Sequence, residues 1–520
     1  MNQRNVEPRW HPLSAEVMTG ISDWRFQHPK ATLRELETEL DARLAHLRAR
    51  MLEDLALESA ASDWTAQPAP APPVCPQCGS PLEPRGRHSR TLQTHGGQSL
   101  TLERRYGVCP VCEIGLFPLD DELALLPGSL TPRLQESLVR LGTLLPSFAL
   151  AAAELTFHTG VEVHRTTASR LSEAAGAAAV AVQTAEVATI LRDYPEPPAG
   201  PERLVFHVDG AMVPLRHGAW GEVKTLAVGA VAPPIEEDGE VVVHTRELSY
   251  FSRLTDSTTF AEAATGELHR RGVTTAGRVG VVVDGAEWIQ GFIDLHAPQA
   301  VRILDFPHAA EYVTAIGQTQ GATGPLLSAE ALAQQLHELQ HAAADEVLAR
   351  LRTLVEEHGE AGELGKQLAY LEKRKAQMQY ARFREEGWPI GSGSGESANK
   401  LVVEARLKGA GMHWAEQNVN AMLALRNAVC NDRWQEVWGQ IEAEQRRQVG
   451  VRREERRRQR RPQPSPEAGG QAAQRGRAQD VVPPPEPPLR DHTWDGRPAA
   501  DHPWRRAWSR RRQCEEAHAA

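Results

Sequence analysis

The sequence has no long hydrophobic run, few cysteines and no excess of positive charge. Its longest run of small apolar residues, Ala174–Val182, is too short to cross a bilayer. Its first residues, Met1–Pro12, are polar and charged, so we expect no apolar segment of a secretory leader there. We therefore expect a cytoplasmic protein with no membrane partner. Because disulfides are rare in the cytoplasm, we do not expect the six cysteines to form structural disulfides.

A net charge of −10, taken alone, argues against binding to nucleic acid. The basic residues are unevenly spread, however, since Arg446–Arg461 holds nine arginines and Arg505–Arg512 holds five. We expect residues 441–520 to form a disordered tail rich in Arg, Pro, Gln and Glu. Such a tail either holds phosphate groups non-specifically or is merely solvated.

Leucines recur at three- and four-residue spacing from Thr32 to Ala61, which predicts an amphipathic helix in an N-terminal helical region of residues 1–66. The spacing approaches a heptad seam, so the helix either dimerises or packs on its own domain. The proline- and alanine-rich stretch Gln67–Val74 predicts a linker.

Two Cys-x-x-Cys pairs lie about thirty residues apart in the segment 67–120, joined by strand-like sequence at Thr91–Thr94 and Ser99–Tyr106. Thiolates at this spacing reach one tetrahedral ion, and the turn residues after each pair let backbone N–H groups face the sulfurs. A redox site would need a single pair in a thioredoxin-like unit. We therefore predict a structural zinc ribbon. Its four expected ligands are Cys75, Cys78, Cys109 and Cys112.

Residues 121–195 predict a run of helices. An amphipathic helix is expected at Arg133–Leu144 and an alanine-rich one at Phe148–Phe157, with a break at Thr159-Gly160 and a polar, basic helix after it. This is the helix-turn-helix arrangement, whose second helix enters the major groove of DNA, although any hairpin of two helices gives a similar pattern. The residues expected to contact DNA are His164, Arg165, Thr167 and Arg170.

From Arg203 the pattern changes to strands, and three buried strands end on an aspartate. The three combinations are Leu204–Val208 with Asp209, Val279–Val283 with Asp284, and Val301–Leu304 with Asp305. Ligands of open α/β sheets lie beyond the strand ends, so these carboxylates predict a metal site. The alternative is that Asp-Gly follows strands because it makes good turns.

The order of elements after Arg203 predicts a fold. Three antiparallel strands are expected, followed by a helix, a strand, a helix and another strand. This is the order of the ribonuclease H-like fold, in which the first and fourth strands are adjacent, so that Asp209 and Asp284 come together. We predict a multidomain α/β protein with an RNase H-like catalytic domain at residues 203–440 and an all-α insertion at about 320–385.

A glycine-rich segment, Trp388–Lys400, leads into a helix that is expected to continue to about Leu407. The glycines let the backbone pack closely, and Glu396 can then project back to the aspartates as a third ligand. The alternative is local, because an acidic residue in the first turn of a helix is favoured by the helix dipole and can pair with Lys400 four residues on.

These residues together resemble the insertion-sequence transposases of the ISKra group, acid-triad (DDE) enzymes distantly related to the Mutator-like transposases. The resemblance spans roughly Thr32 to Trp434. Its motifs are the paired cysteines, V-D-G-A-M-V-P at Asp209, V-V-D-G-A-E-W at Asp284, L-D-F-P-H-A-A-E at Asp305, and G-S-G-S-G-E-S-A-N-K with R-L-K-G-A-G-M-H-W from Gly391 to Trp414.

The resemblance implies DNA cleavage and strand transfer at the terminal inverted repeats of an insertion sequence, into target DNA. Two Mg²⁺ (or Mn²⁺) ions are expected, with Asp209 bridging both, Asp284 on one and Glu396 on the other. Asp305 and His308 would position the scissile phosphate or a ligand, with an ordinary buried histidine as the alternative for His308.

The zinc ribbon and the helix-turn-helix would recognise the repeats, and pairing of two DNA ends implies a homo-oligomer associated with the bacterial nucleoid. Trp288 either stacks on an unpaired base or caps the core, and capping is the simpler expectation. Two alternatives stay open. One is a non-catalytic regulator derived from a transposase, and the other is a nuclease of the same fold that only hydrolyses DNA.

Overall fold

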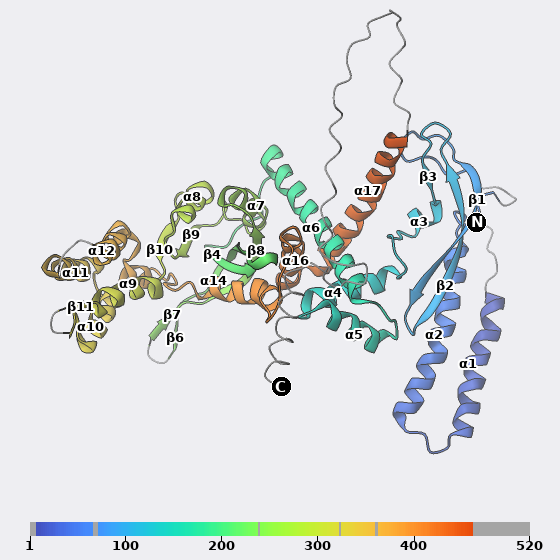
Figure 1. Ribbon diagram of the computed structural model, residues 1–520, viewed down its shortest axis with the longest axis horizontal. Helices are drawn as coiled ribbons and strands as arrows, with labels where there is room; N and C mark the ends of the chain where they lie inside the picture. Colours follow the sequence, from blue (N-terminus) through green and yellow to red (C-terminus); the bar gives the residue numbers. More distant parts are fainter. Residues whose placement is uncertain (1–6, 66–70, 238–239, 322–323, 359–361, 461–520) are drawn as a thin grey trace, which may run out of the picture. The chain divides into compact units, whose positions relative to one another are not determined.

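The computed structural model describes residues 7–65, 71–237, 240–321, 324–358 and 362–460. It is a mixed α/β structure in which helices predominate and one sheet contains both parallel and antiparallel strands. Figure 1 shows the arrangement of the elements, with colours that follow the chain from blue at the N-terminus to red towards the C-terminus. The last residues of the predicted tail, 461–520, lie outside the described part.

The N-terminal region consists of two helices that contact each other, α1 (Glu7–Gln27) and α2 (Leu33–Leu57). We predicted only the second. It begins at a capping box, in which the Thr32 hydroxyl accepts from the backbone N–H of Glu35 and the Glu35 carboxylate accepts from that of Thr32. α2 packs on the neighbouring β-hairpin, yet several of its leucines remain exposed, including Leu33 at 73%.

The cysteine-containing segment forms a three-stranded antiparallel sheet, with strands longer than we predicted. Its strands are β1 (Glu83–Thr94), β2 (Gln98–Val108) and β3 (Gly115–Leu116), and a short helix, α3 (Pro118–Glu122), follows. Gly96 and Gly97 connect β1 to β2 with positive φ angles of 77° and 65°, which glycine adopts without steric cost.

Three helices follow, as the sequence predicts. They are α4 (Pro132–Leu144), α5 (Phe148–Thr159) and α6 (Arg165–Asp193). α5 ends at Gly160, which is left-handed with φ 67°, so the tight turn before α6 is present. The three helices share one apolar core, made of Leu130, Leu134, Leu138, Leu155, Val161 and Ala168. α6 also contacts α7, α16 and α17.

Within the described residues, α6 is the one helix long and apolar enough to cross a membrane by length and composition, which is weak support for a span. Its apolar residues have another explanation. Ala175, Ala178 and Ala179 are fully or almost fully buried in the core that α6 shares with α16. The small residues therefore serve close helix packing.

The central sheet has five strands in the order β10-β9-β4-β5-β8. The strands are β4 (Arg203–Pro214), β5 (Trp220–Val231), β8 (Thr245–Leu254), β9 (Arg278–Val283) and β10 (Val301–Leu304). β4, β5 and β8 are antiparallel neighbours, and β9 and β10 run parallel to β4. The expected adjacency of the first and fourth strands, β4 and β9, is present. The connection before β8 holds a hairpin that we did not predict, β6 (Ile235–Glu237) and β7 (Glu240–Val242).

The sheet is covered by helices on both faces. One core joins it to α7 (Ser257–Arg270) and α8 (Glu287–His296), and another joins it to α9 (Phe306–Gln318) and the predicted insertion. The insertion contains α10 (Ala329–His341), α11 (Ala344–His358), α12 (Glu363–Lys373) and α13 (Tyr380–Glu385). It is helical as expected, apart from a short pairing of β11 (Gln320–Gly321) with β12 (Gly324–Pro325).

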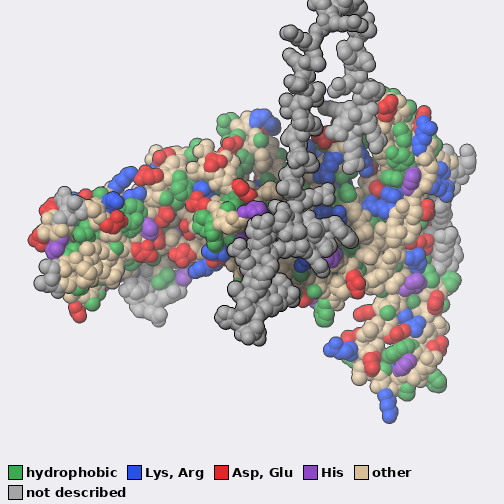
Figure 2. Space-filling model, in the orientation of Figure 1, with side chains coloured by type: hydrophobic (Ala, Val, Ile, Leu, Met, Phe, Trp, Pro, Cys, Tyr) green, Lys and Arg blue, Asp and Glu red, His purple; other side chains and the backbone are tan. Residues whose placement is uncertain are grey.

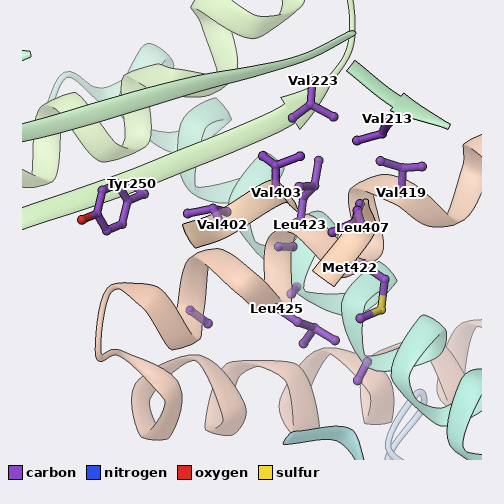
Figure 3. Packing of buried hydrophobic residues seen from close by; sticks show 14 of the residues in the cluster. Val213, Val223, Tyr250, Val402, Val403, Leu407, Val419, Met422, Leu423 and Leu425 are labelled. Carbon is purple, nitrogen blue, oxygen red and sulfur yellow. The ribbon is translucent and has the colours of Figure 1, made fainter. Parts of the chain in front are cut away.

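The C-terminal elements return to the sheet and to α6. They are α14 (Gly393–Ala398), the π-helical segment η3 (Asn399–Glu404), α15 (Ala405–Leu407), α16 (Glu416–Cys430) and α17 (Trp434–Arg460). Figure 3 shows how Val402, Val403 and Leu407 pack against Val419, Met422 and Leu423 in the core that they share.

The predicted start of the disordered tail, residue 441, is too early. α17 continues to Arg460, so it takes in nearly all of the first arginine cluster. Trp434, Trp438 and Ile441 anchor its first turns in the core, with exposures of 4%, 6% and 0%. The predicted boundary depends on the change in composition, and these three buried side chains explain why the helix runs past it.

The crossing of α6 and α16 depends on Gly176. A Cβ atom at this position would lie 2.2 Å from the backbone oxygen of Ala421. We expect Gly176→Ala to lower the free energy of unfolding by about 2–3 kcal/mol, because neither backbone can move without disturbing the core. Gly291→Ala is the control, since a Cβ atom there meets nothing within 4 Å, and it should stabilise α8 by about 0.5–1 kcal/mol. Chemical denaturation measures the free energy of unfolding of both variants. If Gly176→Ala were as stable as the wild-type protein, the close crossing of α6 and α16 would be contradicted.

Candidate active site and metal centre

The four predicted zinc ligands come together. The Sγ atoms of Cys75, Cys78, Cys109 and Cys112 all lie within 4.8 Å of one another. Each pair sits in the same backbone turn, because Gly79 N–H donates to the Cys75 carbonyl at 2.9 Å and Glu113 N–H donates to the Cys109 carbonyl at 2.8 Å. Both turn residues have positive φ angles, 71° and 57°. In the second turn the Cys112 N–H also donates to the Cys109 sulfur at 3.2 Å.

The chemistry of the four thiols fits a bound cation. The pKa of Cys78 is lowered to about 6, chiefly by hydrogen bonds from Ser80, whereas sharing hydrogen bonds with Cys78 raises the pKa of Cys112 to about 12. Thiols this close cannot all ionise without a neutralising charge, and a tetrahedral Zn²⁺ ion would supply it. The ligands also lie in a small apolar core with Trp64, Leu82 and Ile114. These residues can therefore hold a zinc ion.

The carboxylates predicted for the second site line one cavity of about 210 Å³. Asp209 follows the core of β4, Asp284 follows β9, Asp305 follows β10, and Glu396 lies in the first turn of α14. His308, in the first turn of α9, lines the same cavity. All five residues predicted to be catalytic are thus brought together.

The register of the sheet explains why the three aspartates meet. In the parallel pair β4–β9, Phe206 lies opposite Val281, an offset of 75 residues, which equals the offset from Asp209 to Asp284. In β9–β10, Val283 lies opposite Leu304, an offset of 21, which equals the offset from Asp284 to Asp305. Asp284 and Asp305 therefore follow their strands at the level of Asp209, where the carboxyl ends of parallel strands open onto a cleft. Asp209 itself lies inside β4 rather than at its predicted end, because that strand continues to Pro214 along β5.

Asp209 is half-buried and closely held. One carboxylate oxygen accepts from the Gly210 N–H at 2.7 Å, and the other accepts from Asn399 Nδ2 at 2.9 Å. Burial raises the pKa of Asp209, and the charges of Asp284 and Glu396 raise it further. The repulsion among these carboxylates favours a cation between them.

Asp284 stands at the start of a tight loop before α8. Its carboxylate accepts from the Ala286 N–H at 2.9 Å, and Gly285 has a φ angle of 79°. The backbone carbonyls of the loop accept hydrogen bonds from two residues of the helical insertion, Tyr370 and Arg374. The loop is therefore fixed from two sides.

Asp305 uses both carboxylate oxygens on backbone groups. One accepts from the Ser392 N–H at 2.7 Å, and the other caps α9 by accepting from the His308 N–H at 3.2 Å. The Phe306 N–H donates to the Ile390 carbonyl at 2.9 Å beside it. Burial raises the pKa of Asp305, whereas the bonds from Ser392 and His308 lower it. Asp305 thus ties the glycine-rich segment to the end of β10.

His308 is not an ordinary buried histidine. Its side chain keeps 30% of its exposure, lies 3.6 Å from the Glu311 carboxylate and faces the rings of Tyr312 and Tyr370. Trp288 is half-buried and packs against the core that includes α7 and α8, with its ring in edge contact with Phe260 at 6.1 Å.

Glu396 is the exposed member of the set, with 58% of its side chain accessible and its carboxylate 3.9 Å from Lys400. The local pairing that we considered as an alternative is therefore present, although it is loose and solvent-screened. The position of α14 nonetheless depends on a glycine. A Cβ atom at Gly395 would lie 3.2 Å from the Cβ of His207 on β4, whereas Gly391 and Gly393 face open space.

Gly395→Ala is expected to push α14 away from β4. We expect a loss of about 1 kcal/mol in the free energy of unfolding. Because α14 carries Glu396, any activity of the cavity should fall about ten- to a hundredfold. Gly393→Ala, two residues earlier, is the matched control and should change neither quantity. Chemical denaturation and an activity assay check both variants. If Gly395→Ala and Gly393→Ala had the same stability and activity, the close approach of α14 to β4 would not be needed.

The cavity carboxylates are more widely spaced than the cysteines. In the described part of the chain, the four cysteines are the one group of three or more potential ligands whose donor atoms all lie within 4.8 Å. A pair of Mg²⁺ ions about 3.5–4 Å apart spans a wider site than one zinc ion, and Mg²⁺ keeps several of its waters. The acidic lining offers the carboxylate oxygens that such ions bind.

The residues predicted to contact DNA lie at the start of α6. His164 is its N-cap, and its ring nitrogen accepts from the Thr166 N–H at 3.3 Å. His164, Arg165 and Arg170 are exposed, whereas Thr167 is half-buried. Three of the four side chains are thus open to a partner.

Sequence reasoning missed Asn399, which holds Asp209 from outside the cavity lining, and His207, which lines the cavity together with the equally unpredicted Glu311 and Ser392. Asn399 is 6% exposed and holds Asp209, and it begins the π-helical segment η3, a distortion that is common at functional sites. His207 is 1% exposed, and burial lowers its pKa to about 4. Its spacing of two residues from Asp209 along a strand was the available signal, since such residues share a face.

No family model matches the chain, and no curated protein matches it in sequence. The functional assignment therefore depends on the site geometry and the sequence motifs.

Proposed function

We propose that the protein is a DNA transposase that cleaves DNA at the terminal inverted repeats of its insertion sequence and transfers the strand ends to target DNA. The observation that carries this proposal is the cavity in which Asp209, Asp284 and Glu396 converge from two adjacent strands and a C-terminal helix. The strand order, with the first and fourth strands adjacent, supports an RNase H-like fold for residues 203–440.

The proposed reaction is phosphoryl transfer. A water oxygen bonds to the scissile phosphorus, the bond from phosphorus to the DNA 3′-oxygen breaks, and that oxygen takes a proton. In strand transfer the freed 3′-hydroxyl attacks a target phosphate in the same way. Bound Mg²⁺ or Mn²⁺ would lower the pKa of the attacking group and stabilise charge on the leaving oxygen.

The residues have distinct proposed roles. Asp209, between the other two carboxylates, would share both ions, while Asp284 and Glu396 would each hold one. Asn399 orients Asp209 by donating to its Oδ2 atom, and Asp305 holds the segment that leads to Glu396. The half-exposed His308, which lines the cavity, would contact the phosphate.

The N-terminal units suit DNA recognition. The four-cysteine ribbon would be held by Zn²⁺, and the start of α6 offers two exposed arginines, Arg165 and Arg170, after a tight turn. The exposed leucines of α2, among them Leu40 and Leu44, are available to a second copy, in keeping with paired DNA ends. We place the enzyme in the bacterial cytoplasm, on the nucleoid when bound.

Two other functions compete with this one. A regulator derived from a transposase would keep the DNA-binding units without needing the carboxylates, and the intact cavity argues against it. A nuclease of the same fold would use the same cavity, so the two enzymes differ in what they require of the DNA.

A strand-transfer assay separates the three functions. Supercoiled plasmids carrying two, one or no copies of the terminal repeats are incubated with the protein and Mg²⁺, together with an unmarked target plasmid. A transposase joins repeat ends to the target, and does so best with two ends. Cutting without joining, regardless of the number of ends, would indicate a nuclease, and binding without cutting would indicate a regulator.

A further inference from the structure

The helical insertion reaches back to the loop that carries Asp284. The Tyr370 hydroxyl, at the end of α12, donates to the backbone carbonyl of Asp284. Arg374 Nε donates to the carbonyl of Gly285 at 3.0 Å, and a second guanidinium nitrogen donates to the same oxygen. Lys373 adds an ion pair with Glu287 at 2.6 Å. The insertion thus contacts Asp284 and Gly285 in the loop and Glu287 at the start of α8, although 86 to 89 residues separate the partners along the chain.

Arg374 is built into this contact. Its side chain is 8% exposed, and a buried guanidinium is costly unless its N–H groups are paired. Besides its bonds to Gly285, it donates to the Tyr370 carbonyl at 3.2 Å, and its charge lies over the Tyr370 ring at 3.8 Å. A Cβ atom at Gly285 would lie 2.4 Å from Arg374 Nε. A side chain at position 285 would therefore displace the Arg374 guanidinium from this contact.

Tyr370 connects this contact to the cavity. Its ring stacks on Tyr312 of α9, with the centroids 4.0 Å apart and the planes 5° from parallel. The ring of His308, which lines the cavity, makes edge contacts with both tyrosines at 5.3 and 5.9 Å. The insertion thus touches the site through Asp284 on one side and His308 on the other.

The visible surface of the insertion does not suggest a role in binding DNA. Figure 2 shows acidic and basic side chains intermixed over the region of α9 to α12, rather than a patch of one sign that would attract DNA. Besides its contacts with the Asp284 loop, the insertion donates from Gln377 to Gln290 on α8, the helix after that loop, at 3.3 Å.

We propose that the insertion is a positioning element for the carboxylate cavity. Tyr370 and Arg374 fix the backbone of Asp284 and Gly285, while the Ala286 N–H fixes the Asp284 carboxylate, so that Asp284 is set to share cations with Asp209. Groups that orient a metal ligand typically change metal affinity or activity by about 10- to 100-fold when removed. This inference rests on the proposed function of the cavity as a metal site.

The test compares two single-atom deletions. Tyr370→Phe removes the hydroxyl that holds Asp284 and keeps the ring stack, and Tyr312→Phe removes the hydroxyl of the partner ring, for which no hydrogen bond is found among the described residues. Mn²⁺ binding by the full-length protein is measured from the free-ion EPR signal, with Asp209→Asn defining the cavity-specific part. The Mg²⁺ concentration for half-maximal DNA cleavage is measured in parallel.

We expect Tyr370→Phe to weaken cavity-specific Mn²⁺ binding about tenfold and to raise the Mg²⁺ requirement to match, with DNA binding unchanged. Tyr312→Phe should behave like the wild type. Arg374→Lys, which keeps the charge but not the paired donors, should weaken Mn²⁺ binding at least as much as Tyr370→Phe does. If this variant does not fold, Tyr370→Phe alone decides.

The outcomes separate the two proposals. The proposed function would be overturned if the wild-type protein does not cut DNA and the Asp209→Asn variant binds as much Mn²⁺ as the wild type. Only the positioning role would be overturned if the wild-type protein cuts DNA, Asp209→Asn weakens Mn²⁺ binding, and Tyr370→Phe changes neither the Mn²⁺ affinity nor the Mg²⁺ requirement. Equal weakening by Tyr370→Phe and Tyr312→Phe would also overturn it, because the stack rather than the hydrogen bond would then be responsible.

Discussion

Replacing Asp209 with asparagine is expected to lower DNA cleavage by at least about a thousandfold, with DNA binding unchanged. The side chains have the same shape, and the amide oxygen can still accept from Asn399, so the fold should persist. The substitution removes a negative charge that lies close to the charges of Asp284 and Glu396. Initial rates of cleavage measure the effect, and fluorescence anisotropy measures DNA binding.

The matched control for this variant is Asp294→Asn on α8. Asp294 is 65% exposed and pairs with Arg302 outside the cavity, so removing its charge should leave the rate within about twofold. If Asp209→Asn kept more than a tenth of the wild-type rate while Asp294→Asn behaved as expected, Asp209 would not be the shared metal ligand.

Replacing Cys109 with serine is expected to release zinc and unfold the ribbon. Cys109 is completely buried, and its sulfur faces both Cys78 and the Cys112 N–H. Structural zinc contributes about 10–16 kcal/mol of binding free energy in small domains, far more than the few apolar residues around these cysteines can supply. Zinc content should fall from one ion per chain to nearly none, and the amides of β1 and β2 should lose protection from hydrogen exchange.

Cys430→Ser is the control for this prediction, because Cys430 lies on α16, outside the cysteine cluster. It should keep one zinc ion per chain and a protected ribbon. A Cys109→Ser protein that retained stoichiometric zinc would contradict the four-cysteine site. Retained protection in β1 and β2 after zinc loss would show instead that the strands fold without the metal.

The sequence predicted the elements whose stability is local or periodic. β-branched runs identify β4, β9 and β10, and their aspartates fall at one level because the register offsets equal the sequence spacings. The cysteine pairs identify the ribbon because few other arrangements need that spacing. The glycine-rich segment was also informative, although only Gly395 of its glycines meets a close neighbour.

The remaining features depend on contacts between distant parts of the chain. Asn399 lies 190 residues from Asp209, and Arg374 lies 89 residues from Gly285. No pattern in a single sequence pairs such residues. The tail boundary was wrong for a related reason, because the buried face of α17 is decided by the core that it meets rather than by its charge. α1 was missed because its apolar residues form no clear stripe, and Met18 and Phe26 remain exposed.

Cleavage of a DNA fragment carrying the terminal repeats, mapped at single-nucleotide resolution across a Mg²⁺ series, tests the central claim most directly. The carboxylate cavity predicts strand breaks at the repeat ends that leave 3′-hydroxyl groups, require Mg²⁺ or Mn²⁺ and disappear in Glu396→Gln. Fragments that are bound at the repeats but stay intact at every metal concentration would contradict a catalytic cavity. Breaks that persist in Glu396→Gln would contradict the choice of the third carboxylate.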